Sequence, residues 1–124
     1  MREMRKLAKY SLLSDNQPME IRHYLTASGR DPYQEWLDKL KDLTGRIAIQ
    51  RRVDRVAEGN FGDHKPLREG VYELRIDMGP GYRVYYALEG ATIVLLLCGG
   101  IKRMQAADIN RVSRYLHDYQ RRKP

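Results

Sequence analysis

The strongest constraint on the fold is a change of period between Val71 and Cys98. Apolar and polar residues alternate from Val71 to Met78, and again from Tyr82 to Leu88. Alternation with a period of two is typical of strands that have one buried face. A turn, Met78 to Gly81, separates these two segments. A second turn at Glu89-Gly90 separates the latter segment from an apolar run, Thr92 to Cys98. The pattern predicts an antiparallel meander of three strands.

Helical periodicity flanks this meander on both sides. Asp31-Pro32 is a helix-opening pair, and an apolar face then recurs at helical spacing through Leu40. A second helix is expected from Thr44 to Glu58, ended by Gly59, with arginines on its solvent face. A basic amphipathic helix is expected from Met104 to Gln120, and it can cover the sheet. The apolar faces are formed by Tyr33, Trp36, Leu37 and Leu40, by Ile49, Val53 and Val56, and by Ile109, Val112, Leu116 and Tyr119, while Arg46, Arg51, Arg52 and Arg55 are expected in solvent.

A polar break, Ser14 to Pro18, precedes a short strand predicted from Met19 to Leu25. The predicted order is therefore one strand, two helices, three strands and a helix, which is an α+β fold with a small antiparallel-rich sheet. We divide the chain into an N-terminal extension, residues 1–18, which is a short helix or disordered, and one domain, residues 19–120.

The net charge of the chain limits the classes of partner that it can bind. The 124 residues hold 23 Lys and Arg against 16 Asp and Glu, a formal charge of +7. A surface of this charge attracts polyanions, and nucleic acid is the first candidate. A membrane surface or an acidic protein would satisfy the same electrostatics.

Other compositional features indicate a cytoplasmic protein. Cys98, the single cysteine, cannot form an internal disulfide, and its apolar neighbours indicate a buried strand residue. The longest apolar run, Ile93 to Cys98, is far shorter than the roughly 20 residues that cross a bilayer. Met1 to Gln17 has no continuous apolar stretch of the kind found in signal peptides. We therefore expect no membrane association.

Two N-terminal helices on one face of the sheet would leave the other face open. Arg75, Arg83 and Tyr85 are expected to be neighbours on that face and to form one cationic and aromatic patch. Lys102 and Arg103 would border it after the last strand. His64, Lys65 and Arg68, in the loop before Val71, would border its other side and supply further donors to a phosphate. The alternative is that these are ordinary polar residues of a solvated sheet face.

Several ordered motifs carry a family resemblance. GVYELRID, the GPGYRVYY turn and strand, and TIVLLLCGG followed by IKRMQAADI resemble HigB-like addiction module killer proteins of the RelE/ParE superfamily. DPYQEWLDKL resembles their first helix. The resemblance covers about Met19 to Leu116. It implies a RelE-like fold, growth inhibition and a neighbouring antitoxin, but it does not fix the target, because one scaffold hosts several functions.

In RelE-type enzymes, mRNA is cleaved on the ribosome without a metal or another cofactor. The reaction needs a base for the ribose 2′-hydroxyl, cations for the phosphate and an acid for the leaving oxygen. By resemblance, Arg83 matches the arginine of the family's G-Y-R motif, and Arg75 matches a lysine that supports the base. Lys102 or Arg103 falls near an arginine after the last strand. Arginine is an effective anion clamp and a poor base.

The sequence also departs from the family pattern. Glu73 stands where the first sheet lysine is expected, and the base-stacking tyrosine after the last strand has no counterpart. Glu73 or His64 could act as general base. Tyr85 could stack on a base in place of the missing tyrosine, or it could be a packing residue.

We therefore expect a type II toxin that acts as an mRNA endonuclease, with mRNA, the ribosome and an antitoxin of helix-turn-helix type as partners. The alternatives are a non-enzymatic gyrase inhibitor of the ParE type, which would use its helices for contacts, and a non-toxic RNA-binding module. The missing lysine and tyrosine favour the gyrase inhibitor, whereas the arginine-rich sheet face favours RNA cleavage.

Overall fold

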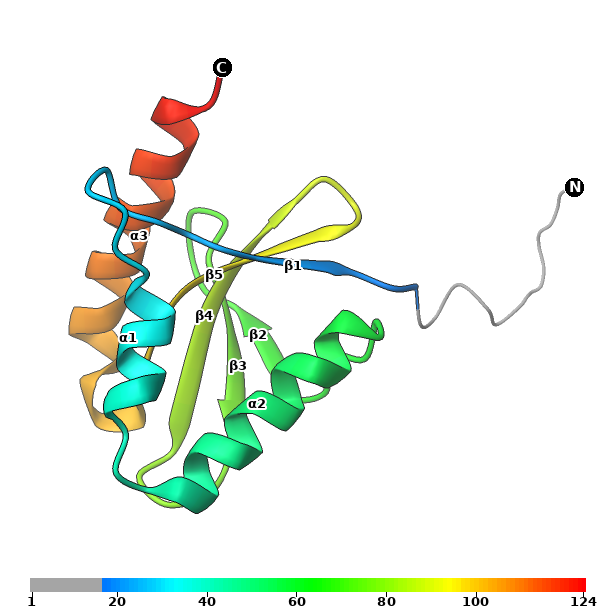
Figure 1. Cartoon of the computed structure of the whole chain (residues 1–124), viewed down its shortest axis with the longest axis vertical. Coiled ribbons are helices and arrows are strands. Elements are labelled where there is room, and N and C mark those ends of the chain that lie inside the picture. The colour runs from blue at the N-terminus through cyan, green and yellow to red at the C-terminus, as the bar shows by residue number, and fades with distance from the viewer. Residues whose placement is uncertain (1–16) are drawn as a thin grey trace, which may run out of the picture.

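The computed structural model describes residues 17–124, which form an α+β fold of one five-stranded mixed sheet and three α-helices (Figure 1). Nearly all of the N-terminal extension, residues 1–16, lies outside the described residues. The elements are β1 (Glu20–His23), α1 (Pro32–Lys39), α2 (Leu43–Ala57), β2 (His64–Pro66), β3 (Tyr72–Ile76), β4 (Tyr82–Glu89), β5 (Ile93–Ile101), the 3-10 turn η2 (Lys102–Met104) and α3 (Gln105–Arg122).

The sheet has the strand order β1-β5-β4-β3-β2. The predicted meander is confirmed as β3, β4 and β5, which pair antiparallel. β1 pairs parallel to β5, with Glu20 opposite Ile93. The segment from His64 to Pro66, expected to be a loop, is an edge strand instead, and it pairs antiparallel with β3. An edge strand tolerates Pro66, because a proline has no amide hydrogen to donate and an edge strand has one side without a partner strand.

Aspartate side chains fix the starts of both N-terminal helices. Asp31 accepts a hydrogen bond from the Gln34 amide at 3.0 Å, and Pro32 takes the first helical position, where no amide hydrogen is needed. Asp42 accepts a hydrogen bond from the Gly45 amide at 3.0 Å, so α2 begins one residue before the predicted Thr44. The other carboxylate oxygen of Asp42 accepts a hydrogen bond from the Tyr82 hydroxyl at 2.8 Å, which ties the start of α2 to β4.

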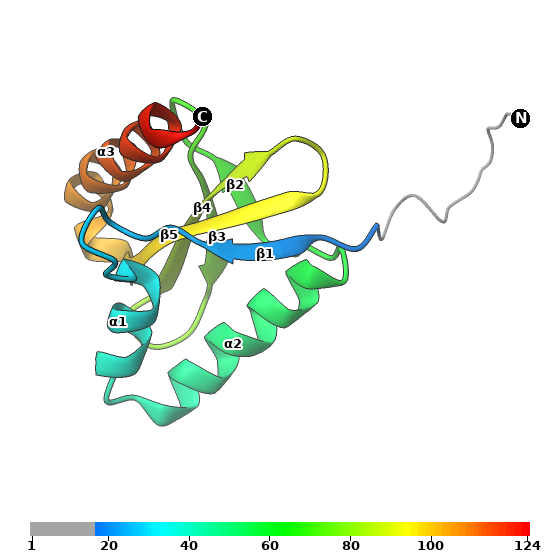
Figure 2. The ribbon, with the colours of Figure 1, turned by 45° about the horizontal axis from the view of Figure 1, so that its top comes forward.

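Two hydrophobic cores lie on opposite faces of the sheet. One contains apolar residues of α1 and α2, among them Tyr33, Leu37 and Ile49, packed on strand residues such as Val84. The other contains Val112 and Leu116 of α3 packed against the opposite strand residues. Figure 2 shows α2 and α3 apart, with the strands between them. The expectation that the second face is open is wrong, because α3 covers part of it.

Gly99 and Gly100 allow both layers to approach β5 closely. A Cβ atom at Gly99 would overlap the Trp36 ring, and one at Gly100 would overlap the Asp108 carboxylate. Trp36 is thus partly buried and packs against the core, the side that its helical spacing predicts. Asp108 lies in the first turn of α3 and is buried. The glycine pair therefore sets how near α1 and the start of α3 come to the sheet.

Candidate functional site

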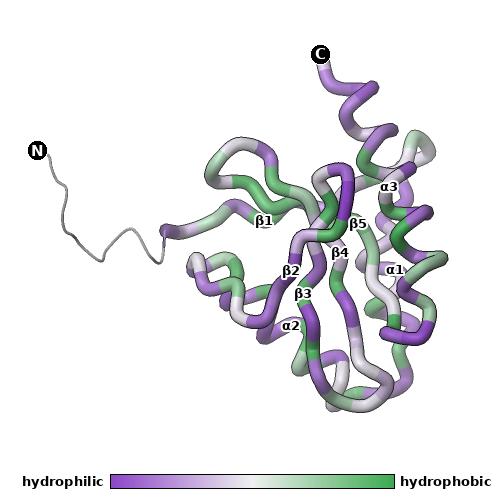
Figure 3. The backbone as a smooth tube through the Cα atoms, turned by 180° about the vertical axis from the view of Figure 1, so that it is seen from behind, coloured by the Kyte–Doolittle hydropathy of each residue, from purple (hydrophilic) through white to green (hydrophobic). Residues whose placement is uncertain are grey.

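The residues of the predicted cationic patch share one sheet face, but several of them are buried. Arg75 lies opposite Arg83, and Glu73 lies opposite Tyr85, across the β3-β4 pair. Glu73 is 1% exposed and Arg83 8%. Both were expected on an exposed face, and this prediction is wrong because the start of α3 lies against them. Figure 3 shows hydrophilic stretches along β2 and β3.

Glu73 is held through one oxygen of its carboxylate. The Gln105 side-chain amide donates a hydrogen bond to Glu73 Oε1 at 2.7 Å. Arg83 Nε lies 3.6 Å from the same oxygen. Arg83 also donates through Nη1 to the Tyr82 carbonyl at 3.0 Å. A buried carboxylate requires partners of this kind to offset the loss of water, so Glu73, Arg83 and Gln105 form one cluster, which we call the Glu73 cluster.

Sequence reasoning missed Gln105. It is the first residue of α3, and its polar side chain there looks like that of any solvated helix start. Contact with Glu73, 32 positions earlier in the chain, depends on how α3 folds back over the sheet. No local pattern carries that information.

A small cavity opens beside Arg83. It has a volume of about 220 Å³ and is lined by Asp63, Arg75, Asp77 and Arg83. Arg75 donates through Nη2 and Nε to Asp63 Oδ1 at 3.0 and 3.2 Å. These hydrogen bonds hold the pKa of Asp63 below its ordinary value. Arg75, one of the two arginines of the predicted cationic patch, is thus paired with an acidic side chain.

Lys102 and Arg103 follow the last strand, and the side chains of Lys102 and Arg83 both lie beside Gly81. Lys102 and Arg103 are exposed in η2, directly before α3. The Lys102 amide donates to the Gly81 carbonyl at 2.8 Å, which anchors η2 to the turn that leads into β4. Lys102 therefore lies beside Arg83, and Arg103 follows it in η2.

Tyr85 is a packing residue in this structure. It is fully buried in the core beneath α3, and burial raises its pKa. The alternative in which its ring stacks on a base is contradicted by that burial.

Two more residues lie on the same face of the sheet. Asp108 accepts a hydrogen bond from Arg111 at 2.9 Å, and burial raises the pKa of its carboxyl. Cys98 is buried in the same core, as predicted.

The structure separates His64 from the Glu73 cluster. His64 lies opposite Leu74, which belongs to the core beneath α1 and α2, and its ring centroid lies 5.5 Å from that of Phe61. Its Nδ1 donates to the Gly62 carbonyl at 2.9 Å. Because side chains alternate along a strand, His64 points to the face opposite Glu73.

The two cations that follow His64 belong to the predicted side. Lys65 lies opposite Glu73 and is exposed, which places it at the sheet edge on the face of the Glu73 cluster. Arg68 donates a hydrogen bond to Asn110 of α3. Both therefore border the face that α3 covers.

Arg52 is one of the four arginines of α2 that were expected in solvent, and for this residue the prediction is wrong, because its side chain is partly buried. It donates to the Arg75 carbonyl at 2.6 Å and to the Phe61 and Asp63 carbonyls at 3.0 Å. Partial burial lowers the pKa of its guanidinium. Arg52 therefore fixes the segment that carries Asp63 against the end of β3, a role that its position on a charged helix face does not indicate.

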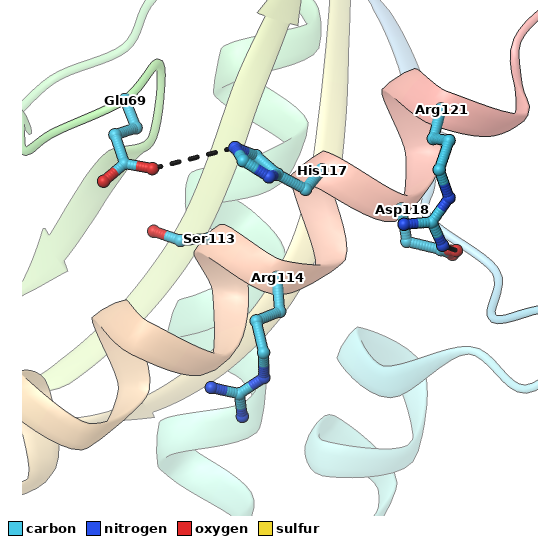
Figure 4. A pocket seen from close by; sticks show the side chains of 6 residues that line it. All are labelled: Glu69, Ser113, Arg114, His117, Asp118 and Arg121. Carbon is cyan, nitrogen blue, oxygen red and sulfur yellow. Dashed lines mark hydrogen bonds and ion pairs between the residues drawn. The ribbon is translucent and has the colours of Figure 1, made fainter.

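A larger cavity, of about 430 Å³, lies along the outer side of α3 (Figure 4). Its lining comprises Glu69, Ser113, Arg114, His117, Asp118 and Arg121. His117 Nε2 lies 3.8 Å from Glu69 Oε1. None of the predicted site residues lines this cavity, and acidic and basic groups share it.

Among residues 17–124, no helix combines the length and the apolar character needed to cross a membrane. In the same range, no three His, Cys, Asp or Glu side chains come together in a way that could hold a metal ion.

The structure defines the class of the protein as a small basic α+β protein whose sheet carries a buried carboxylate and arginine pair beneath its last helix. No protein-family profile matches the chain. A protein of Haemophilus influenzae described as uncharacterized is 47% identical over 79 residues, which are 64% of this chain and 80% of the relative. The chain belongs to the same family as this protein.

Proposed function

We propose that the protein is the toxin of a type II toxin-antitoxin system, with a RelE-like fold, and that it cleaves mRNA on the ribosome without a metal ion. The observation that carries this proposal is the Glu73 cluster, in which Glu73 lies 3.6 Å from Arg83 and is bordered by exposed cations. The resemblance of the motifs around Arg75, Arg83 and Lys102 to HigB-like killer proteins supports it.

The residues suit cleavage by internal attack. Glu73 is buried beneath the start of α3, so this step requires that segment to move aside when the ribosome is bound. Glu73 then takes the proton from a ribose 2′-hydroxyl, and the 2′-oxygen forms a bond to the adjacent phosphorus. The bond from phosphorus to the 5′-oxygen breaks, and water supplies the proton to the leaving oxygen. Arg83 holds the phosphate as its negative charge increases, and Arg75 and Lys102 assist. The products are a 2′,3′-cyclic phosphate and a 5′-hydroxyl.

The domain contributes little to the orientation of its substrate. The 220 Å³ cavity is small, and acidic side chains line half of it. We therefore assign substrate alignment to ribosomal RNA, which would supply the effective concentration that a preformed pocket supplies in larger enzymes. Cleavage is then expected only where ribosomes translate.

The test is pulse expression without antitoxin, followed by mapping of new RNA 5′ ends. We expect growth arrest and cuts inside translated reading frames. Arg83→Ala should lower the cleavage rate about 10²- to 10³-fold, which corresponds to about 2.7–4 kcal/mol for one donor to a developing anion. Arg55→Ala, at an exposed arginine of α2, is the matched control and should cleave like the wild type. Equal cleavage of naked RNA would refute ribosome dependence, and full toxicity of Arg83→Ala at equal protein level would remove Arg83 from the site.

One observation favours a second function, inhibition of DNA gyrase by binding. Tyr85, the residue considered for base stacking, is fully buried. A gyrase inhibitor needs no stacking aromatic and no general base. Intact transcripts together with accumulating gyrase–DNA complexes in the same cells would establish this function in place of the first.

We also propose an antitoxin of helix-turn-helix type, encoded by a neighbouring gene, that presents acidic side chains or a helix to the surface around Arg75, Arg83 and α3. Co-purification of the co-expressed neighbouring protein tests its existence, and hydrogen exchange of the toxin with and without it tests its position. Protection confined to α1 and α2 would refute neutralisation by covering the Glu73 cluster.

A further inference from the structure

We propose that the 220 Å³ cavity beside Arg83 is a binding site for one nucleobase, guanine, of single-stranded RNA. Asp77 accepts hydrogen bonds from the edge of the base, and Arg83 donates to its carbonyl oxygen. This inference deepens the proposed function and rests on it for its RNA substrate. The ribosome still aligns the phosphate, while the cavity selects the base beside it.

The charges and the size of the cavity favour a base over a phosphate. Two carboxylates, of Asp63 and Asp77, and two guanidinium groups, of Arg75 and Arg83, line it, so their formal charges cancel. A phosphate inside the cavity would lie against both carboxylates, which repel an anion. The volume of about 220 Å³ is below the roughly 300–1,000 Å³ of pockets that hold whole small ligands. The cavity therefore suits one neutral group that has both donors and acceptors.

Arg83 offers this cavity one free donor. Its Nη1 donates to the Tyr82 carbonyl at 3.0 Å, and its Nε lies 3.6 Å from Glu73 Oε1. Within residues 17–124, Nη2 makes no hydrogen bond, and the only nitrogen of Arg83 that is both buried and unpaired is Nε. Nη2 is therefore accessible. Although Arg83 is 8% exposed, this edge of its guanidinium opens into the cavity that Arg83 lines.

Asp77 offers the free acceptor. It directly follows the last residue of β3 and is exposed. Among the described residues, its carboxylate has neither a hydrogen bond nor an ion pair, whereas Asp63 accepts a hydrogen bond from Arg75 at 3.0 Å. Asp77 and Arg83 thus line one cavity as an acceptor and a donor that are not paired with each other.

Guanine matches this pair better than the other RNA bases do. It alone presents two adjacent donors, N1–H and the N2 amino group, next to a carbonyl acceptor, O6. A carboxylate accepts from both donors, and a guanidinium donates to O6. Adenine and cytosine have an acceptor next to their amino group, and uracil has a single donor, so each of these bases leaves part of the site unpaired. Unstacked bases of single-stranded RNA are commonly recognised along this edge.

The experiment measures binding of the full chain to short labelled oligouridine RNAs by fluorescence anisotropy. The central nucleotide is guanosine, adenosine, cytidine or inosine, which lacks the N2 amino group. We expect the wild type to bind the guanosine RNA at least about fivefold more tightly than the other three. Asp77→Asn should abolish this preference, because an amide has one acceptor oxygen and cannot accept from both donors at once. Asp54→Asn, at an exposed residue of α2, removes the same charge and should keep the preference.

Equal affinity of the wild type for the four RNAs, or no measurable binding, would overturn the inference. A guanosine preference that survives Asp77→Asn would overturn it as well. These outcomes are distinct from a failure of the proposed function. Cleavage on ribosomes by a protein that binds all four RNAs equally refutes the base site alone. A guanosine preference in binding without cleavage on ribosomes refutes the proposed function and supports the base site.

Discussion

Replacement of Gly100 by alanine tests the contact that anchors α3. The added methyl carbon would approach Asp108 Oδ2 to less than 3.0 Å, a separation that real Cβ atoms essentially never show. Asp108 cannot turn aside cheaply, because it is buried and accepts a hydrogen bond from Arg111 at 2.9 Å. Overpacking of this kind costs about 1–3 kcal/mol, and the gain from replacing a strand glycine offsets roughly 0.5–1 kcal/mol of it. We expect Gly100→Ala to lower the free energy of unfolding by about 1–2 kcal/mol.

The assay is urea unfolding of four proteins: wild type, Gly100→Ala, Asp108→Ala and the double variant. If the methyl group meets Asp108, the loss caused by Gly100→Ala should nearly disappear in the Asp108→Ala background, with a coupling of about 1–2 kcal/mol. Gly90→Ala is the control: Gly90 has a φ of 61° and open space around it, so its substitution should cost backbone strain alone, equally in both backgrounds. The same loss for Gly100→Ala with and without Asp108 would refute the packing argument.

Two further predictions concern carboxylates. Asp63→Asn removes the carboxylate paired with Arg75 and should raise the affinity for single-stranded RNA. The gain should be only about two- to fivefold at low salt, because an exposed ion pair is weak. Fluorescence anisotropy measures the affinity, and an equal gain for Asp54→Asn, at an exposed residue of α2, would show an effect of net charge alone. Asp42 has its pKa lowered by the Gly45 amide and then by the Tyr82 hydroxyl, so its ionised form stabilises the fold above the unfolded-state pKa and this contribution is lost as the pH falls. The difference in unfolding free energy between wild type and Asp42→Asn should be constant above about pH 5 and shrink below about pH 4, as followed by urea unfolding; a difference that grows on acidification would contradict this.

Local patterns predicted the elements well and the cluster less well. The period-two alternation found β3 and β4 and separated Glu73, Arg83 and Tyr85 from the residues of the other face. It could not predict that Glu73 and Arg83 are buried, because that depends on where the start of α3 lies. The same holds for Arg52, whose partners are backbone carbonyls of a distant segment. Alternation assigns a residue to one face of the sheet, and only the packing of the helices on the sheet decides whether that face is exposed to solvent.

The short strand β2 was missed for a different reason. Its three residues, His64 to Pro66, include a proline and have no apolar alternation. The strand exists because β3 offers a free edge, and its register with Glu73 and Leu74 then decides that His64 and Lys65 point to opposite faces. The prediction that grouped these two residues with Arg68 in one loop therefore could not separate them.

The parallel pairing of β1 with β5 affects how the chain is made. Glu20 is synthesised about 70 residues before its partner Ile93. At roughly 5–20 residues per second, translation takes several seconds to supply that partner, and the apolar faces of α1 and α2 have no complete sheet to cover in that interval. Gln105 follows later still, so the Glu73 cluster closes only after the start of α3 has been made. The same delay gives a chaperone time to reach the apolar faces of the chain first.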